Sequence, residues 1–250
     1  MRAIARGWLL ATGLGIYLSA LIATLPATLA DAGLNAASAG RMRVADAQGT
    51  LWSGSGHFEV RAADGRSAYG TALAWRLHPG ALIRARIGYT VQVGTGSGPF
   101  PVTISWSRIE VADARIDLPA SALALGAPTL APLALSGHLR VDIPEFSVGR
   151  GNAAGNAVLR WQAAASALSP VSPLGDYEVR FSADGTAMHT SLATLHGPLQ
   201  LDGGGTWPIG AKPAFLATAR MPAELYAQLA PFLRLIAVER GDRSFEVLIR

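Results

Sequence analysis

The sequence predicts a mainly β protein: a single N-terminal transmembrane helix, then a repeated antiparallel β-strand domain that forms a curved open sheet or groove, with one or two short helices. Three related stretches are the basis of this prediction. A glycine turn leads into a strand in Ser55–Val60, the pattern returns in Ser136–Val141, and a degraded copy stands at His196–Leu201. Apolar and polar residues alternate with a period of two in the first two copies, which is typical of strands with one buried face.

A second glycine element, ending in tryptophan, follows each copy at a distance. These elements run from Gly70 to Trp75, from Gly155 to Trp161 and from Gly205 to Trp207. Self-similarity of this kind indicates a repeated structural unit. We therefore predict a strand pair that is used three times, over residues 49–79, 133–170 and 195–210. Chance recurrence in a chain rich in glycine and alanine is the alternative.

Residues 1–30 are predicted to be a signal-anchor helix. Arg2 and Arg6 precede the stretch Gly7–Ala30, which carries no charged side chain and whose apolar run approaches the roughly 20 residues that span a bilayer. By the positive-inside rule the N-terminus then lies in the cytoplasm and everything after Asp31 lies across the membrane. A signal peptide cleaved after Thr28-Leu29-Ala30 is the alternative, because small residues stand at the right spacing.

Residues 31–40 consist largely of Ala, Gly, Ser and Asn, and this composition predicts a linker. The β domain is predicted over residues 41–250. Its first part, Gly49–Gly56, is rich in glycine around Trp52, which suits tight turns and a kinked strand. A phosphate-binding loop is excluded there, because no Gly-Lys-Ser/Thr ending and no apolar helix follow.

Further along, Asp64-Gly65 is a hairpin signal. Strict alternation over Ala81–Val93 predicts a strand with one apolar and one solvated face. Ile104 and Ile109 have opposite parity, which predicts a bulge near Ser107 and Arg108. The remaining predicted elements are a short helix at Pro119–Leu125, a strand from Tyr177 to a turn at Asp184-Gly185, an amphipathic helix at Pro222–Ile236 and a last strand at Phe245–Ile249.

Composition limits the kinds of partner and chemistry. The chain has 21 Lys plus Arg against 17 Asp plus Glu, a net charge of +4, but the basic residues are spread along it. This spread argues against a nucleic-acid partner, which requires a basic patch on one face. The chain has no cysteine, which excludes disulfides, thiolate catalysis and iron–sulfur clusters.

No residue is predicted to be catalytic, to bind a cofactor or to bind a metal. The histidines do not show metal-ligand spacing, and His57 and His138 occupy equivalent repeat positions, which favours a shared structural role over a zinc site. The chain lacks a Gly-X-Ser-X-Gly elbow, and its carboxylates are isolated from one another. We therefore expect a protein that is not an enzyme and that uses no cofactor.

Five tryptophans, Trp52, Trp75, Trp106, Trp161 and Trp207, stand near predicted strand ends. They suit either of two roles. As structural residues they fill the middle of a curved sheet, and as functional residues they form a ligand-stacking or membrane-interface belt. We favour the structural role.

One set of motifs runs in order along nearly the whole chain. It comprises Gly49, Thr50, Trp52 and Gly54, then Trp75 and Pro79, then Leu174, Gly175 and Tyr177, then Gly197 and Leu199, and lastly Gly205 and Trp207. With the anchor before it and a helix at Pro222–Leu233 after it, this set resembles the type II secretion system protein N family. Pro198 and the loops rich in Ala and Arg depart from the family pattern.

The resemblance implies a bitopic inner-membrane protein of the general secretion pathway, which exports folded periplasmic proteins across the outer membrane. It also implies a non-catalytic accessory role beside the inner-membrane platform proteins, which would be its partners. On this basis the motif residues serve structure or interaction.

A lipid-binding function is the alternative. Long alternating strands can curl into a groove with an apolar lining, similar to the AsmA-like bridge proteins of the bacterial envelope, which carry lipid chains between membranes. The two functions differ in what covers the apolar face expected from Ile83, Ile87, Tyr89 and Val91: a self-contained core for the secretion component, and an acyl chain for the lipid carrier.

Overall fold

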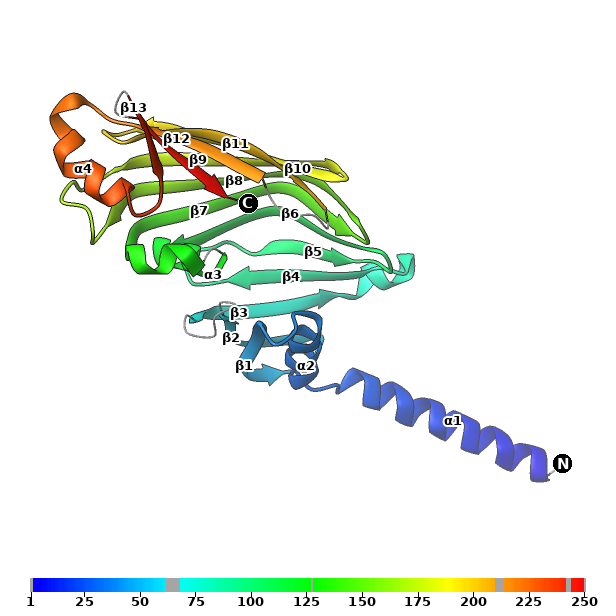
Figure 1. Ribbon diagram of the computed structural model, residues 1–250. Coiled ribbons are helices and arrows are strands. Elements are labelled where there is room, and N and C mark those ends of the chain that lie inside the picture. The colour runs from blue at the N-terminus through cyan, green and yellow to red at the C-terminus, as the bar shows by residue number, and fades with distance from the viewer. Residues whose placement is uncertain (1, 62–67, 127, 210–213, 242–243, 250) are drawn as a thin grey trace.

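The computed structural model describes residues 2–61, 68–126, 128–209, 214–241 and 244–249. Within them, fourteen strands form one open antiparallel sheet in the order β1-β2-β3-β4-β5-β6-β7-β8-β9-β10-β11-β12-β14-β13, which Figure 1 shows as a curved layer. Nearly every strand pairs with its sequence neighbours, and only β14 is inserted between β12 and β13. This architecture confirms the predicted mainly β, open antiparallel sheet.

The strands are long in the middle of the sheet and short at the C-terminal edge. Their bounds are β1 (Met42–Gly49), β2 (Ser53–Arg61), β3 (Ala68–His78), β4 (Ile87–Val93), β5 (Phe100–Ile104), β6 (Arg108–Pro119), β7 (Leu135–Gly149), β8 (Asn152–Ser166), β9 (Gly175–Gly185), β10 (Ala187–His196), β11 (Gln200–Pro208), β12 (Ala214–Arg220), β13 (Val238–Gly241) and β14 (Ser244–Ile249).

The helices are few and, apart from the first, short. The α-helices are α1 (Arg2–Ala23), α2 (Thr28–Ala37), α3 (Leu123–Gly126) and α4 (Tyr226–Leu233), and the 3₁₀ turns are η1 (Pro79–Arg84), η2 (Ala120–Ala122), η3 (Pro128–Leu133) and η4 (Ala223–Leu225). The helices predicted near residues 119–125 and 222–236 are thus present as η2 with α3 and as η4 with α4.

α1 covers most of the stretch that the sequence predicts to be a membrane anchor. The predicted single-pass span is not confirmed, because none of the helices described here is both long enough and apolar enough to cross a membrane.

The linker predicted at residues 31–40 is wrong, because most of it belongs to α2. The Oδ1 atom of Asp31 accepts a hydrogen bond of 2.7 Å from the backbone N–H of Val44 in β1. Ala30 and Leu34 pack against the cluster that contains Val44. Alanine, which suggested a linker, is also the strongest helix former, and contact with β1 decides the outcome.

The strand predicted over Ala81–Val93 begins six residues later than predicted, at Ile87. Residues Pro79–Arg84 form η1 instead, with Pro79 in the first turn, where its missing N–H costs nothing. Ala85 then adopts a left-handed conformation with φ of 52°, and β4 starts only at Ile87. The predicted alternation therefore holds for the second half of the stretch alone.

The bulge predicted near Ser107 and Arg108 is a hairpin turn between β5 and β6. Both the backbone N–H and the Oγ–H of Ser105 donate hydrogen bonds to the carbonyl oxygen of Arg108, at 2.8 and 2.9 Å. Ile104 pairs directly with Ile109, so the two side chains share one face of the sheet. The change of parity arises because four residues, 105–108, separate the paired Ile104 and Ile109.

The turn predicted at Asp184-Gly185 is confirmed, and the backbone N–H of Ala187 donates to Oδ1 of Asp184 at 3.3 Å. The predicted last strand is β14, whereas β13 was not predicted. The hairpin signal at Asp64-Gly65 lies outside the described residues.

The predicted repeat unit corresponds to two hairpins, β2–β3 and β7–β8, which differ in register. Trp75 lies opposite Gly54, whereas Trp161 lies opposite Leu139. The third copy is divided, because His196 ends β10 and Gln200 begins β11. The first two copies are therefore both hairpins with a tryptophan in the second strand, but the residue opposite the tryptophan differs.

Two apolar clusters pack against the two ends of the sheet. One includes Val44 and Trp75 beside α2, and the other includes Leu229 and Phe232 of α4 with Phe245 of β14. Figure 1 shows α2 and α4 at opposite ends of the layer.

Candidate functional site

The first group of motif residues forms a turn around Trp75. The indole N–H of Trp75 donates to the carbonyl oxygens of Leu51 and Thr50, at 3.1 and 3.3 Å, and the side chain is 9% exposed. Gly54 lies opposite in β2, where an added Cβ would stand 2.5 Å from the indole ring. A glycine is needed there because the ring packs directly on the backbone.

This turn also forms hydrogen bonds with the end of α1 and with the segment that follows it. The indole N–H of Trp52 donates to the carbonyl oxygen of Ile22 at 2.8 Å, and the backbone N–H of Ala27 donates to the carbonyl oxygen of Gly49 at 3.2 Å. Gly49 has a φ of +91°, which favours glycine. Pro79 lies further along, at the start of η1. This geometry indicates a structural role, in which the turn connects the end of α1 to the β sheet.

The second group meets where β9 begins and β10 ends. Gly197 has a φ of +125°, and a Cβ added to it would lie 2.3 Å from the Cα of Gly175. The phenol O–H of Tyr177 donates to the carbonyl oxygen of Leu199 at 2.9 Å, and the backbone N–H of Leu199 donates to the carbonyl oxygen of Leu174 at 3.1 Å. Burial, with a smaller contribution from the charge of Asp176, raises the pKa of Tyr177, so the phenol stays protonated.

The third group stays apart from the other two. Gly205 lies in β11 against β12, where a Cβ would stand 2.2 Å from the carbonyl oxygen of Ala214. Trp207 pairs with Met188 in β10, and its indole N–H is buried without a hydrogen-bond partner among the described residues. The thirteen motif residues are thus distributed over separate packing sites and are not brought together in one pocket.

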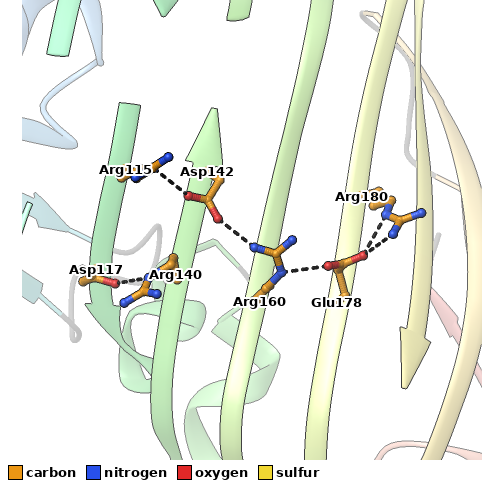
Figure 2. A network of polar contacts seen from close by, with 7 residues as sticks. All are labelled: Arg115, Asp117, Arg140, Asp142, Arg160, Glu178 and Arg180. Atoms are coloured by element: carbon orange, nitrogen blue, oxygen red, sulfur yellow. Dashed lines mark hydrogen bonds and ion pairs between the residues drawn. The ribbon is translucent and has the colours of Figure 1, made fainter. Parts of the chain in front are cut away.

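A set of charged residues that the sequence did not single out lies across four neighbouring strands, β6 to β9 (Figure 2). We call it the charged ladder. It consists of Arg115, Asp117, Arg140, Asp142, Arg160, Glu178 and Arg180. Their strands could be predicted from alternation, but the pairing of Arg160 with Glu178 depends on a register that no pattern in the sequence reveals.

Arg160 stands at the centre of the charged ladder. Its Nε donates to Oε2 of Glu178 at 2.8 Å, and its Nη1 donates to Oδ2 of Asp142 at 3.1 Å. Arg180 adds a second hydrogen bond to Glu178, from Nε to Oε1 at 2.7 Å. Arg115 approaches Asp142 from β6, with 3.6 Å between Nε and Oδ1. The result is a chain of alternating charges that crosses the strands.

Glu178 is the most enclosed member of the charged ladder, with a side chain that is 7% exposed. Burial raises the pKa of its carboxyl group, but the hydrogen bonds and charges of Arg160 and Arg180 outweigh burial and bring the pKa below the ordinary value. Beside it, Asp117 raises the pKa of Arg140 by a hydrogen bond and by its charge. Glu178 and Arg140 are therefore both ionised at neutral pH.

A hollow of about 1030 Å³ lies beside the ladder, lined by residues that include Arg115, Asp142, Arg160, Pro99 and Pro144. Four arginines face three carboxylates in the ladder, and Arg115 and Arg180 point to solvent with side chains that are 82% and 70% exposed. Such an arrangement can dock a charged partner surface. Within the described residues, no group of three or more His, Cys, Asp or Glu could hold a metal ion.

The opposite face of the same strands is apolar. Val141, Leu159, Val179 and Leu192 stand side by side in one row across β7 to β10, and each is partly exposed. They alternate along the chain with the charged residues Arg140, Arg160 and Glu178, so the two rows lie on opposite faces. The sheet thus presents a charged face and an apolar face that is covered mainly near its ends.

Comparison with known proteins gives one match. Residues 40–247 match the family model described as type II secretion system (T2SS), protein N, whereas no curated protein and no solved structure matches the chain. The match covers nearly all of the β sheet, from the start of β1 to within β14. The chain therefore belongs to the type II secretion system protein N family.

Proposed function

We propose that this protein is a non-catalytic accessory component of type II secretion that docks on inner-membrane platform proteins through the charged ladder. Membership of the family supports involvement in type II secretion. The observation that carries the docking proposal is the exposure of Arg115 and Arg180 at the two ends of the ladder, while Glu178 between them is enclosed. In this proposal the β sheet lies in the periplasm, beside the inner membrane.

The enclosed carboxylate of Glu178 holds the exposed Arg180 in place. Both Nε and Nη2 of Arg180 lie 2.7 Å from one oxygen of Glu178, Oε1, and this double contact fixes the orientation of the guanidinium group. A fixed cation loses little conformational freedom when it binds a carboxylate of a partner. The ladder therefore offers preorganised positive charge to an acidic protein surface.

The experiment is complementation of a strain that lacks this gene. The variant carries Arg115→Glu together with Arg180→Glu, and the measurement is the fraction of a secreted substrate that reaches the medium. We expect the substrate to accumulate in the periplasm, because reversed charges repel an acidic partner. Arg220→Glu is the control, since Arg220 is exposed on β12 away from the ladder. Normal secretion by a folded double variant contradicts the proposal.

Lipid binding is a second candidate function, and the row formed by Val141, Leu159, Val179 and Leu192 favours it, because these side chains remain partly exposed between the two covered ends. The residues that the sequence predicts to line the groove give less support to lipid binding. Tyr89 and Val91 pack against the cluster beside α2, and Ile83 lies in η1.

Mass spectrometry of organic extracts from the purified full chain tests this candidate. Bound phospholipid in the wild type and its loss in Leu159→Asp would support it. Leu216→Asp is the control, because Leu216 is exposed on the charged face of the sheet. An extract of the wild type without lipid contradicts lipid binding and leaves the docking proposal intact.

A further inference from the structure

Trp106 is the exception among the five tryptophans that were assigned to the interior of the sheet. It occupies the turn between β5 and β6 and is 94% exposed. The two hydrogen bonds from Ser105 to the carbonyl oxygen of Arg108 close this turn. The indole ring is therefore presented to solvent on a hairpin of defined shape, and it contributes almost nothing to the core.

A row of exposed aliphatic side chains adjoins Trp106. Ile87 of β4 pairs with Ile104 of β5, Ile104 pairs with Ile109 of β6, and Ile109 pairs with Val148 of β7. Residues that pair directly share a face and stand about 5 Å apart. All four are exposed, between 36% and 49%. We call Trp106 and these four residues the apolar rim.

Arginines border the apolar rim. Arg86 directly precedes Ile87, Arg108 directly precedes Ile109, and Arg150 follows Val148 by two residues. Arg86 has a loose ion pair with Glu110, at 3.9 Å. Among the described residues, no carboxylate lies within ion-pair distance of Arg108 or Arg150. Within the described part of the chain, Arg108 and Arg150 thus flank the apolar surface without an ion pair, whereas Arg86 is loosely paired.

We propose that the apolar rim docks on an anionic phospholipid surface. Trp prefers the boundary between headgroups and acyl chains, because its ring is apolar and its N–H is polar. The aliphatic row behind it can enter the same boundary, and the arginines can contact lipid phosphates. The rim lies at the end of a hairpin, where Trp106 is 94% exposed and can contact a flat membrane.

The apolar rim has no residue in common with the charged ladder, so lipid docking by the rim is independent of the proposed docking through the ladder. The rim lies at the ends of β4 to β7, in the middle of the strand order. Docking there would set the orientation of the sheet relative to a membrane.

The test uses the absence of cysteine in the chain. Trp106→Cys in the full chain introduces a single thiol, which is labelled with an environment-sensitive fluorophore. The labelled protein is mixed with vesicles of phosphatidylethanolamine and phosphatidylglycerol, and separately with vesicles of phosphatidylcholine. Leu168→Cys is the control. Leu168 is exposed in the loop that follows the end of β8, whereas the start of β8 lies beside Val148 of the rim. Since the readout is local, membrane contact made by α1 does not produce it.

We expect a several-fold rise and a blue shift of emission from position 106 with the anionic vesicles, quenching by brominated acyl chains, and no change at position 168. Adding Arg108→Gln should weaken the apparent vesicle affinity about fivefold, whereas Arg220→Gln should not. An emission spectrum at position 106 that is unchanged by anionic vesicles overturns the proposal. A change that requires the platform proteins and not lipid also overturns it, because the rim would then be a protein interface.

Discussion

The guanidinium group of Arg160 donates a hydrogen bond of 2.8 Å to Glu178 across the β8–β9 pair, at a carboxylate that is almost enclosed by the protein. Because Arg180 holds the other oxygen of the same carboxylate, Glu178 joins two cations on neighbouring strands. This relationship organises the charged face of the sheet, and it supplies the first two predictions.

Replacing Glu178 with Gln should destabilise the protein. The change keeps the shape of the side chain but leaves two arginines without their shared anion, and the loss of charged hydrogen bonds from an enclosed group costs about 1–3 kcal/mol. The free energy of unfolding in urea measures the effect. Asp117→Asn is the matched control on the same face, and it should cost much less because the Asp117–Arg140 pair is exposed. Equal losses in the two variants would contradict the enclosed role of Glu178.

The stability difference between wild type and Glu178→Gln should depend on pH. Since the pKa of Glu178 is lowered in the folded state, its contribution is fully present above about 4.3, the ordinary pKa of glutamate, and is lost as the pH falls through the folded value. Urea unfolding of both proteins at a series of pH values should therefore show the curves converging in acid. A difference that stays constant from neutral pH into that range would exclude an ionised Glu178 as its source.

Gly197→Ala should be more harmful than Gly185→Ala. Both glycines have nearly the same φ, +125° and +121°, so the backbone strain of alanine is similar. A Cβ on Gly197 would meet the backbone of Gly175 at 2.3 Å, whereas a Cβ on Gly185 meets nothing within 4 Å. We expect a cost of about 1 kcal/mol at Gly185 and at least about 2 kcal/mol at Gly197, by thermal unfolding. Indistinguishable melting temperatures would mean that the close approach at Gly175 is not made.

Leu229→Ala should destabilise the C-terminal end of the sheet. Leu229 of α4 is fully buried among Leu174, Leu199 and Phe245, so its truncation leaves a cavity that costs about 2–5 kcal/mol. Leu235→Ala is the control, because that leucine follows the same helix and is 63% exposed. Denaturant unfolding measures both. A cost for Leu235→Ala as large as that for Leu229→Ala would show that α4 does not cover the sheet in this way.

Much of the fold follows from local patterns in the sequence. Alternation located most of the strands, and Pro119 and the apolar spacing after Pro222 located the short helices. Contacts between distant residues account for the errors. Residues 31–37 are helical because α2 packs on β1, and Ile104 and Ile109 change parity because a turn separates their strands.

The candidate site was less predictable than the fold. Gly54 and Gly197, two of the motif residues, lie where the backbone has a close neighbour. The charged ladder depends on which residue of β8 faces which residue of β9, and a slip of one residue would place Arg160 opposite an apolar side chain. The exposure of Trp106 could not be predicted either, because a tryptophan occurs both in buried cores and at exposed binding surfaces. The turn between β5 and β6 decides which of the two applies.

In-cell photo-crosslinking tests the central claim, that the charged ladder docks this chain on the secretion platform, most directly. A crosslinking amino acid replaces Arg180 in one strain and Arg220 in another, and the products are identified with antibodies against the inner-membrane platform proteins. We expect a product that contains a platform protein from position 180 and little or none from position 220. No platform product from position 180, or equal yields from the two positions, would contradict it.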